Sequence, residues 1–97
     1  MIIVHDTFIC KPGNASKMAK MFKGAMKGWR DVVNVMTDMT GQYNKVVMVS
    51  KYKSLAAYEK SFEKYMKASP ELKKMMEKMA GYTDMYLTGS REIFRVW

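Results

Sequence analysis

Two neighbouring residues near the start of the chain, His5 and Asp6, have side chains that commonly act as general acids or bases. They lie in a stretch rich in Ile, Val, Thr and Phe, which favours a β-strand, where adjacent side chains point to opposite faces. They therefore cannot form an acid–base pair within one chain, and only one of them can face a cavity. If Asp6 does so, desolvation favours its neutral form and so makes its carboxylate a stronger base, which would suit proton abstraction from a phenol. A carboxylate that meets solvent or Arg91 is an equally good interpretation, and His5 is predicted to be structural.

Phenolic and amide side chains could orient the oxygens of a flat ligand. Tyr52 and Tyr86 offer hydroxyl donors and ring faces, whereas the helical spacing of Tyr58 favours packing. Asn34 interrupts an apolar strand. Because a buried amide needs hydrogen-bond partners, Asn34 either contacts a ligand or water or lies at a hairpin edge.

Several chemical classes lack the residues that they need. The single Cys10 can neither close an intramolecular disulfide nor build a cysteine metal cage. The chain has no zinc spacing, no Gly-rich phosphate loop and no nucleophile elbow, which disfavours hydrolases and nucleotide-dependent enzymes. The 12 methionines could ligate copper, but helical positions such as Met18 and Met21 favour core packing. We therefore expect no metal and no cofactor.

The chain carries a formal net charge of +8, and residues 11–30 hold basic side chains with no acidic one. Such a face is most often solvated, although it could bind an anionic partner. Residues 44–50 lack the aromatic motif of RNA-binding sheets, so no specific nucleic acid is expected. No apolar run approaches the roughly 18 residues of a membrane span. With one cysteine and no basic leader before an apolar stretch, we expect a cytoplasmic protein.

The pattern of apolar residues predicts six elements in the order β-α-β-β-α-β. The expected strands cover residues 1–10, 30–40, 44–52, and 82–87 continuing with 91–97 around a bulge at Gly89. One helix follows Asn14 and ends near Gly28, and a second follows Ser54, breaks at Ser69-Pro70 and ends at Gly81. This order predicts a single α+β domain, residues 1–97, with the ferredoxin-like βαββαβ arrangement: a four-stranded antiparallel sheet with both helices on one face.

Two helices can cover only one face of this sheet. The other face should still be apolar, because Ile3, Ile9, Val47 and Val49 alternate with the residues that face the helices. Large exposed apolar patches are rare on monomers. We therefore predict a homodimer whose two sheets pack face to face.

The chain as a whole resembles the dimeric α+β barrel superfamily, which includes antibiotic-biosynthesis monooxygenases, heme-degrading monooxygenases and NIPSNAP-like proteins. The resemblance rests on four segments: Phe8-Ile9-Cys10-Lys11-Pro12-Gly13, Lys51-Tyr52-Lys53-Ser54-Leu55, Ser69-Pro70-Glu71-Leu72 and Gly89-Ser90-Arg91-Glu92-Ile93. Members often hold a small ligand between the sheet and the second helix. Several oxidise aromatic compounds with O2 and use neither metal nor flavin.

The resemblance also implies site residues. Asp6 matches a pocket Asn of heme-degrading relatives, and Tyr52 matches a pocket Trp. Their axial His corresponds to about Met76, and His5 is the only histidine, which disfavours heme degradation. The implied catalytic residues are Asp6 as proton acceptor and Tyr52. The implied substrate-binding residues are Phe8, Asn34, Met48, Tyr86 and Met76.

The implied function is a homodimeric, cofactor-independent monooxygenase that acts on an aromatic, quinol or polyketide-like substrate. The alternative is a non-catalytic ligand-binding or scaffold dimer of the NIPSNAP-like type, with the basic face of its first helix available to an anionic partner.

Overall fold

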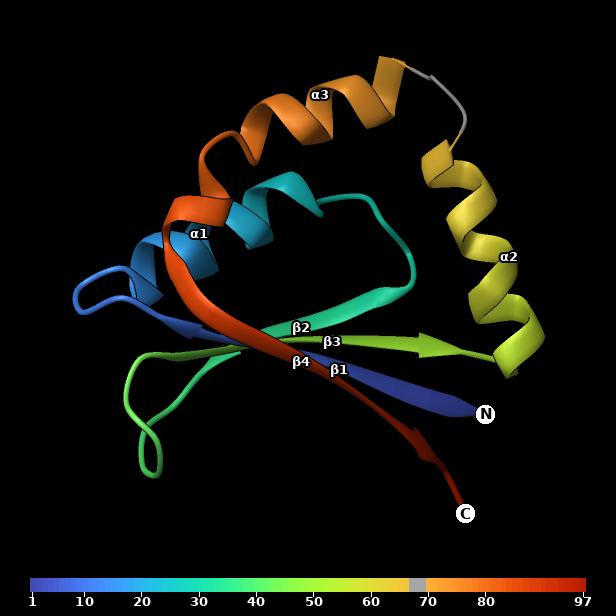
Figure 1. Ribbon diagram of the computed structural model, residues 1–97. Helices are drawn as coiled ribbons and strands as arrows, with labels where there is room; N and C mark the ends of the chain where they lie inside the picture. Colours follow the sequence, from blue (N-terminus) through green and yellow to red (C-terminus); the bar gives the residue numbers. More distant parts are fainter. Residues whose placement is uncertain (67–69) are drawn as a thin grey trace.

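The computed structural model describes residues 1–66 and 70–97. Its strands are β1 (Ile2–Cys10), β2 (Val32–Thr37), β3 (Lys45–Tyr52) and β4 (Tyr86–Arg95). Its helices are α1 (Ala15–Ala25), α2 (Leu55–Met66), α3 (Pro70–Lys78) and a short 3₁₀ turn, η1 (Tyr82–Asp84). The predicted fold class is confirmed, because one four-stranded antiparallel sheet has all its helices on one side (Figure 1).

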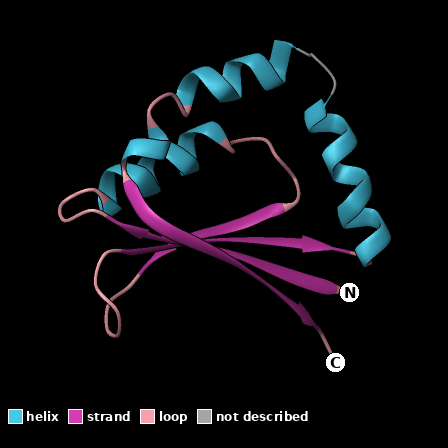
Figure 2. Ribbon diagram, viewed as in Figure 1, coloured by secondary structure: helices cyan, strands magenta, loops and turns pink. Residues whose placement is uncertain are grey.

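The sheet has the strand order β2-β3-β1-β4, so β1 lies between β3 and β4. Each neighbouring pair is antiparallel. Figure 2 shows the strands as one twisted layer with α1, α2 and α3 above it. Pro70 begins α3, where its missing N–H removes no helical hydrogen bond. The other half of the expected break, Ser69, lies outside the described residues.

The main core forms where α1 packs on the sheet. Met18 and Phe22 are fully buried against Cys10 and Val46. These helical residues repeat at the spacing of an amphipathic helix, and the lysines of α1 are exposed on its opposite side. A second cluster joins Ala25 to α3, which contributes buried Leu72 and Met75. Met18 and Met75 thus fill the core as predicted, but Met76 does not, because its side chain is 64% exposed.

The predicted start of the last strand is wrong. Gly81 adopts the left-handed conformation, with φ of 82°, and Tyr82–Asp84 form a 3₁₀ turn closed by the Met85 N–H donating to the Tyr82 carbonyl. The strand then runs unbroken to Arg95, and its irregularity lies opposite Ile9 and Cys10 rather than at Gly89. Gly89 has a different role, because a Cβ there would lie 3.3 Å from the Thr7 carbonyl oxygen and 3.6 Å from the Phe8 ring.

The predicted hairpin of β2 and β3 is present, but both its first strand and the helix before it are shorter than predicted. Strand β2 ends at Thr37, and the Lys45 N–H donates to the Asp38 carboxylate at 2.8 Å across the connection. Helix α1 ends at Ala25, and its expected N-cap residue, Asn14, makes no side-chain capping bond.

The helix-free face is part apolar and part polar. By register, Ile3, Val47 and Phe94 lie on it, and Phe94 is 46% exposed. The face also carries Ser90 and Glu92 of β4, so it is less apolar than expected. Figure 1 shows the β2–β3 connection and the C-terminus on this same side of the sheet.

Candidate ligand-binding site

A cavity of about 220 Å³ lies between the sheet and α2. Its walls come from all four strands of the sheet, from α2 and from the residue that follows α1. Its lining residues are Asp6, Met26, Val32, Met48, Ser50, Tyr52, Tyr58, Ser61, Phe62 and Arg91. We call this the inner cavity.

Strand alternation brings Asp6 into the inner cavity. On β1, the residues on the same face as Asp6 include Val4 and Cys10, which are buried under the helices. The register then places Met48 of β3 on one side of Asp6 and Arg91 of β4 on the other. His5 lies on the opposite face, where its ring packs edge-on against Phe94 at 5.2 Å. The two neighbours are therefore separated by the sheet, as the sequence predicted.

Asp6 and Arg91 form an ion pair inside this site. The Arg91 Nε donates to Asp6 Oδ1 at 2.5 Å, and the side chains are 51% and 13% exposed, respectively. This hydrogen bond raises the pKa of the Arg91 guanidinium, against a smaller lowering by desolvation. Asp6 thus faces the cavity as a carboxylate that meets Arg91, which is the second of the two interpretations of this residue. A paired carboxylate holds the guanidinium in place and remains a hydrogen-bond acceptor.

The paired guanidinium lies against aromatic rings of α2. The Arg91 Cζ is 5.8 Å from the ring centres of both Tyr58 and Phe62. At these distances a guanidinium is attracted to the ring faces. Arg91 therefore links β4 to α2 and covers one side of the inner cavity.

Tyr58 has an unsatisfied hydroxyl group. Its ring centre is 4.9 Å from those of Tyr52 and Phe62, which makes a continuous aromatic wall. The Tyr58 hydroxyl oxygen is buried and has no hydrogen-bond partner among the described residues. Burial raises the pKa of the Tyr58 phenol, and the positive charge of Arg91 partly offsets this. A buried hydroxyl without a partner costs about 1–3 kcal/mol, so it marks a place where a ligand acceptor would be stabilising.

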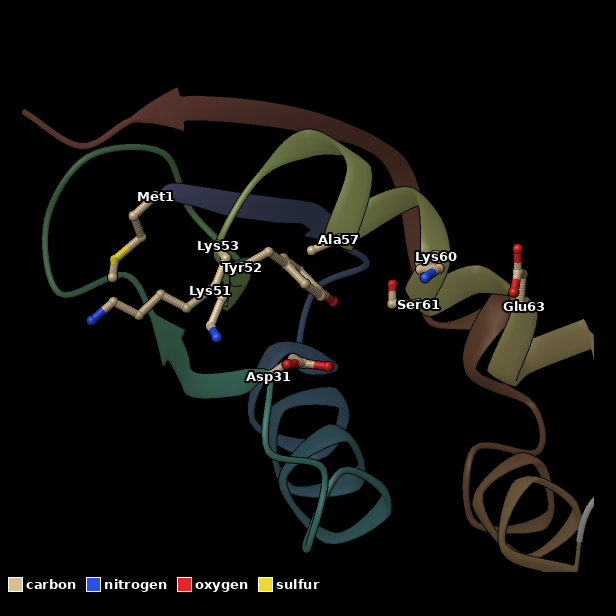
Figure 3. Close-up of a pocket in the computed structure, with 9 residues that line it drawn as sticks. All are labelled: Met1, Asp31, Lys51, Tyr52, Lys53, Ala57, Lys60, Ser61 and Glu63. Carbon is tan, nitrogen blue, oxygen red and sulfur yellow. The ribbon is translucent and has the colours of Figure 1, made fainter.

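A larger outer cavity, of about 660 Å³, adjoins the inner one. The two cavities share Tyr52 and Ser61 as lining residues. Figure 3 shows the Tyr52 side chain extending below Ala57 toward Ser61. The remaining lining residues are Met1, Asp31, Lys51, Lys53, Lys60 and Glu63. Helix α2 forms the roof of this space, and its first turn is capped by Ser54, whose Oγ accepts from the Ala57 N–H at 3.1 Å.

The structure brings together three of the predicted site residues: Asp6, Met48 and Tyr52. Phe8 and Tyr86 lie elsewhere, with ring centres 5.1 Å apart, packed against the core around Met18.

The structure also places Asn34 and Met76 away from the cavity. Val32 lines the inner cavity, but the register shifts between Val32 and Asn34, so Asn34 pairs with Val49 on the helix-free face. A regular strand would have placed these two residues on the same face, which is the reason for the difference. Met76 is an exposed residue of α3.

Two features of this site differ from what the sequence predicts. The helical spacing of Tyr58 favours packing, but Tyr58 and Phe62 form a cavity wall. Arg91 is expected only as a possible partner for Asp6, but it also contacts the aromatic rings of α2. The spacing of four between Tyr58 and Phe62, one turn of helix, was the available indication of an aromatic wall.

Within the described ranges, no three side chains of His, Cys, Asp or Glu lie together as a metal site would require. No helix in those ranges has the length and apolar composition needed to cross a bilayer. The side chains that line the inner cavity offer an ion pair, phenol and serine hydroxyl groups, and thioethers.

A four-stranded antiparallel sheet of this order, with its helices on one face, defines a ferredoxin-like α+β fold. Solved structures with this fold include an uncharacterized NIPSNAP domain protein from Burkholderia xenovorans, with a TM-score of 0.78, 14% identity and coverage of 100% of this chain and 95% of that chain. A NIPSNAP family protein from Agrobacterium tumefaciens has a TM-score of 0.76 and 10% identity over 97% of this chain and 90% of that chain.

An antibiotic biosynthesis monooxygenase is also similar in structure, with a TM-score of 0.63 and 10% identity over 100% of this chain and 99% of that chain. By sequence, no protein-family model and no curated protein matches the chain. The resemblance inferred from the sequence is thus confirmed for the fold, and at these identities it extends no further.

Proposed function

We propose that this protein binds a small, flat aromatic molecule in the inner cavity, with an oxygen of the ligand accepting a hydrogen bond from Tyr58. The observation that carries this proposal is the buried, unpartnered Tyr58 hydroxyl in a cavity walled by aromatic rings. The rings of Tyr52 and Phe62 offer faces for stacking, and Met48 adapts to the outline of a ligand. The fold similarity to NIPSNAP proteins and to an antibiotic biosynthesis monooxygenase agrees with a small-molecule site.

The protein acts, in this proposal, as a homodimer in the cytoplasm. The dimer is supported by the helix-free face, which carries partly exposed Phe94 beside Ile3 and partly exposed Met36 beside Val47, and a second sheet would cover these side chains. Each subunit keeps its own cavity, because the cavity lies on the helix side. The buried single thiol, Cys10, agrees with a reducing compartment.

Oxidation of a phenol by O2 is the candidate activity, and the observation that favours it is the position of the Asp6 carboxylate in the same cavity as the Tyr58 hydroxyl. Asp6 would accept the phenol proton, while Tyr52 and Arg91 hold the resulting anion. A phenol with a free para position plus O2 would yield a para-quinone and one water. One oxygen atom enters the ring, the other leaves as water, and the ring supplies the four electrons.

Ligand binding is tested by titrating the protein with a naphthol whose para position is free and following the change in tyrosine fluorescence. Met48→Trp adds a bulky ring to the inner cavity, and we expect it to weaken naphthol binding about tenfold or more. Met76→Trp is the matched control, because Met76 lies on exposed α3, and it should leave affinity unchanged. Equal affinity in both folded variants would overturn the binding proposal.

Oxygen uptake separates catalysis from binding. With the same naphthol we expect O2 consumption and a matching yield of naphthoquinone, both reduced in Asp6→Asn and Tyr52→Phe. If the naphthol binds in the inner cavity but no oxygen is consumed by it or by a panel of hydroquinones, the protein is a non-catalytic ligand-binding or scaffold dimer.

A further inference from the structure

Three lysines surround the outer cavity without carboxylate partners. Lys51 and Lys53 come from the end of β3 and the residue after it, and Lys60 from α2. None of the three makes an ion pair with a described residue. Figure 3 shows Lys51 and Lys53 on one side of Tyr52 and Lys60 on the other. Their positive charges therefore flank the opening next to the aromatic wall.

Among the described residues, the carboxylates around the outer cavity neutralise this charge only in part. Two acidic residues, Asp31 and Glu63, also line the outer cavity, so three lysines against two carboxylates leave one positive charge. The first turn of α2 holds no acidic residue, and the whole chain carries +8. Positive charge concentrated around a cavity raises the local concentration of anions.

We propose that the outer cavity binds a singly charged acidic group of the ligand, so that the ligand class is an aromatic acid. This rests on the proposed function, because the ring system of the ligand occupies the inner cavity. The two spaces meet at Tyr52 and Ser61, so one molecule can reach both. Its rings lie against Tyr58 and Phe62, and its carboxylate, or a sulfonate in its place, lies in the outer cavity, where Lys51, Lys53 and Lys60 supply positive charge.

The test uses two fluorescent probes with the same ring system. Anilinonaphthalene sulfonate carries one negative charge, and phenylnaphthylamine is the same molecule without the sulfonate. Three proteins are compared with the unsubstituted chain: the rim variant Lys51→Gln/Lys53→Gln/Lys60→Gln, the control variant Lys17→Gln/Lys20→Gln/Lys23→Gln, and Met48→Trp. The control removes the same charge from exposed positions of α1. Met48→Trp adds a ring to the inner cavity, where the rings of both probes would lie.

We expect the sulfonate probe to bind the unsubstituted protein about five- to thirtyfold more tightly than the neutral probe at low salt, the range that a few exposed ion pairs provide. The rim variant should lose this preference and bind the neutral probe as before. The control variant should keep the preference, and Met48→Trp should weaken the binding of both probes.

Two results separate the failure of this inference from that of the proposed function. If Met48→Trp weakens binding of the neutral probe but the sulfonate brings no gain in affinity, or the control variant loses that gain as fully as the rim variant, only the acidic-group inference is overturned. If Met48→Trp, with its fold intact by circular dichroism, changes the binding of neither probe, the inner cavity is not the binding site. Both proposals then fail together.

Discussion

At the scale of single residues, the cavity under α2 combines a satisfied charge with an unsatisfied hydroxyl. The Asp6–Arg91 pair compensates its own charge, and Arg91 also lies over the rings of Tyr58 and Phe62. The hydroxyl of Tyr58 has no such compensation among the described residues. A buried donor that destabilises the ligand-free protein but can donate a hydrogen bond to a ligand is typical of a binding site, where function often costs stability.

This contrast predicts opposite effects for Tyr58→Phe. Removal of the orphan hydroxyl should stabilise the ligand-free protein by about 1 kcal/mol, because the ring stays and the desolvated group is lost. The same change should weaken naphthol binding about fivefold to tenfold, which is the worth of one hydrogen bond. Urea unfolding and fluorescence titration measure the two effects. A variant that loses stability and keeps its affinity would contradict the role of the hydroxyl.

The raised pKa of Tyr58 adds a dependence on alkaline pH. Burial favours the neutral phenol, so the folded pKa lies above the unfolded value of 10.0. The unfolded chain then loses its proton first, and the contribution to stability that is present below pH 10.0 is lost as pH rises through the folded pKa. The free energy of unfolding should therefore fall more steeply above that pH in the unsubstituted protein than in Tyr58→Phe. Parallel curves would mean that Tyr58 titrates as it does in the unfolded chain.

At the scale of elements, the site depends on where α2 begins and how it is held over the sheet. Ser54 caps the helix through the Ala57 N–H, and α2 then places Tyr58, Ser61 and Phe62 on the side that faces the sheet. The Ser61 hydroxyl donates to the Tyr58 carbonyl at 2.5 Å within the same helix. Helix α2 packs against β3 and, through Arg91, against β4. Its first turn, which directly follows β3, therefore helps to hold the helix over the sheet.

Loss of this cap should be measurable. Ser54→Ala should lower the free energy of unfolding by about 0.5–2 kcal/mol and weaken naphthol binding, because the N-terminal turn of α2 frays. Asn14→Ala is the matched control, since Asn14 precedes α1 in the same position but makes no side-chain capping bond. Urea unfolding of both variants provides the comparison, and equal losses would show that the Ser54 bond has no special weight.

At the scale of the whole molecule, the helices cover one face of the sheet and leave the other to solvent or to a second subunit. The exposed face includes Ile3, Met36 and Phe94 but also Ser90 and Glu92, so an interface there would combine apolar with polar side chains. Such a composition is typical of interfaces between subunits.

The proposed dimer predicts the effect of a charge among the apolar side chains of its interface. Sedimentation at micromolar concentration should give twice the chain mass of 11.3 kDa for the unsubstituted protein and the single mass for Phe94→Glu, because the glutamate would be buried without a partner. Leu55→Glu, an equally drastic change at an exposed position of α2, should leave the dimer intact. A single mass for the unsubstituted protein would remove the dimer from the proposal.

Local pattern was enough to predict most of the architecture. The alternation along β1 and the 3.6-residue period of α1 and α3 depend on residues close together in the chain, so they yield the element order, the fold class and the opposite orientations of His5 and Asp6. The same reasoning failed where a short segment has several acceptable conformations. Tyr82–Asp84 has strand-forming residues but forms a 3₁₀ turn, because Gly81 directs the chain into it.

The composition of the site was decided by tertiary contacts that no local pattern encodes. Asp6 and Arg91 are 85 residues apart, and their pairing follows from the β1–β4 register. A single irregularity in β2 moved Asn34 to the face opposite Val32, because side chains in a strand alternate and one extra residue reverses every later position. The Tyr58 hydroxyl likewise has no hydrogen-bond partner among the described residues. This depends on which side chains surround it after the helix has packed on the sheet, and those side chains are distant in sequence.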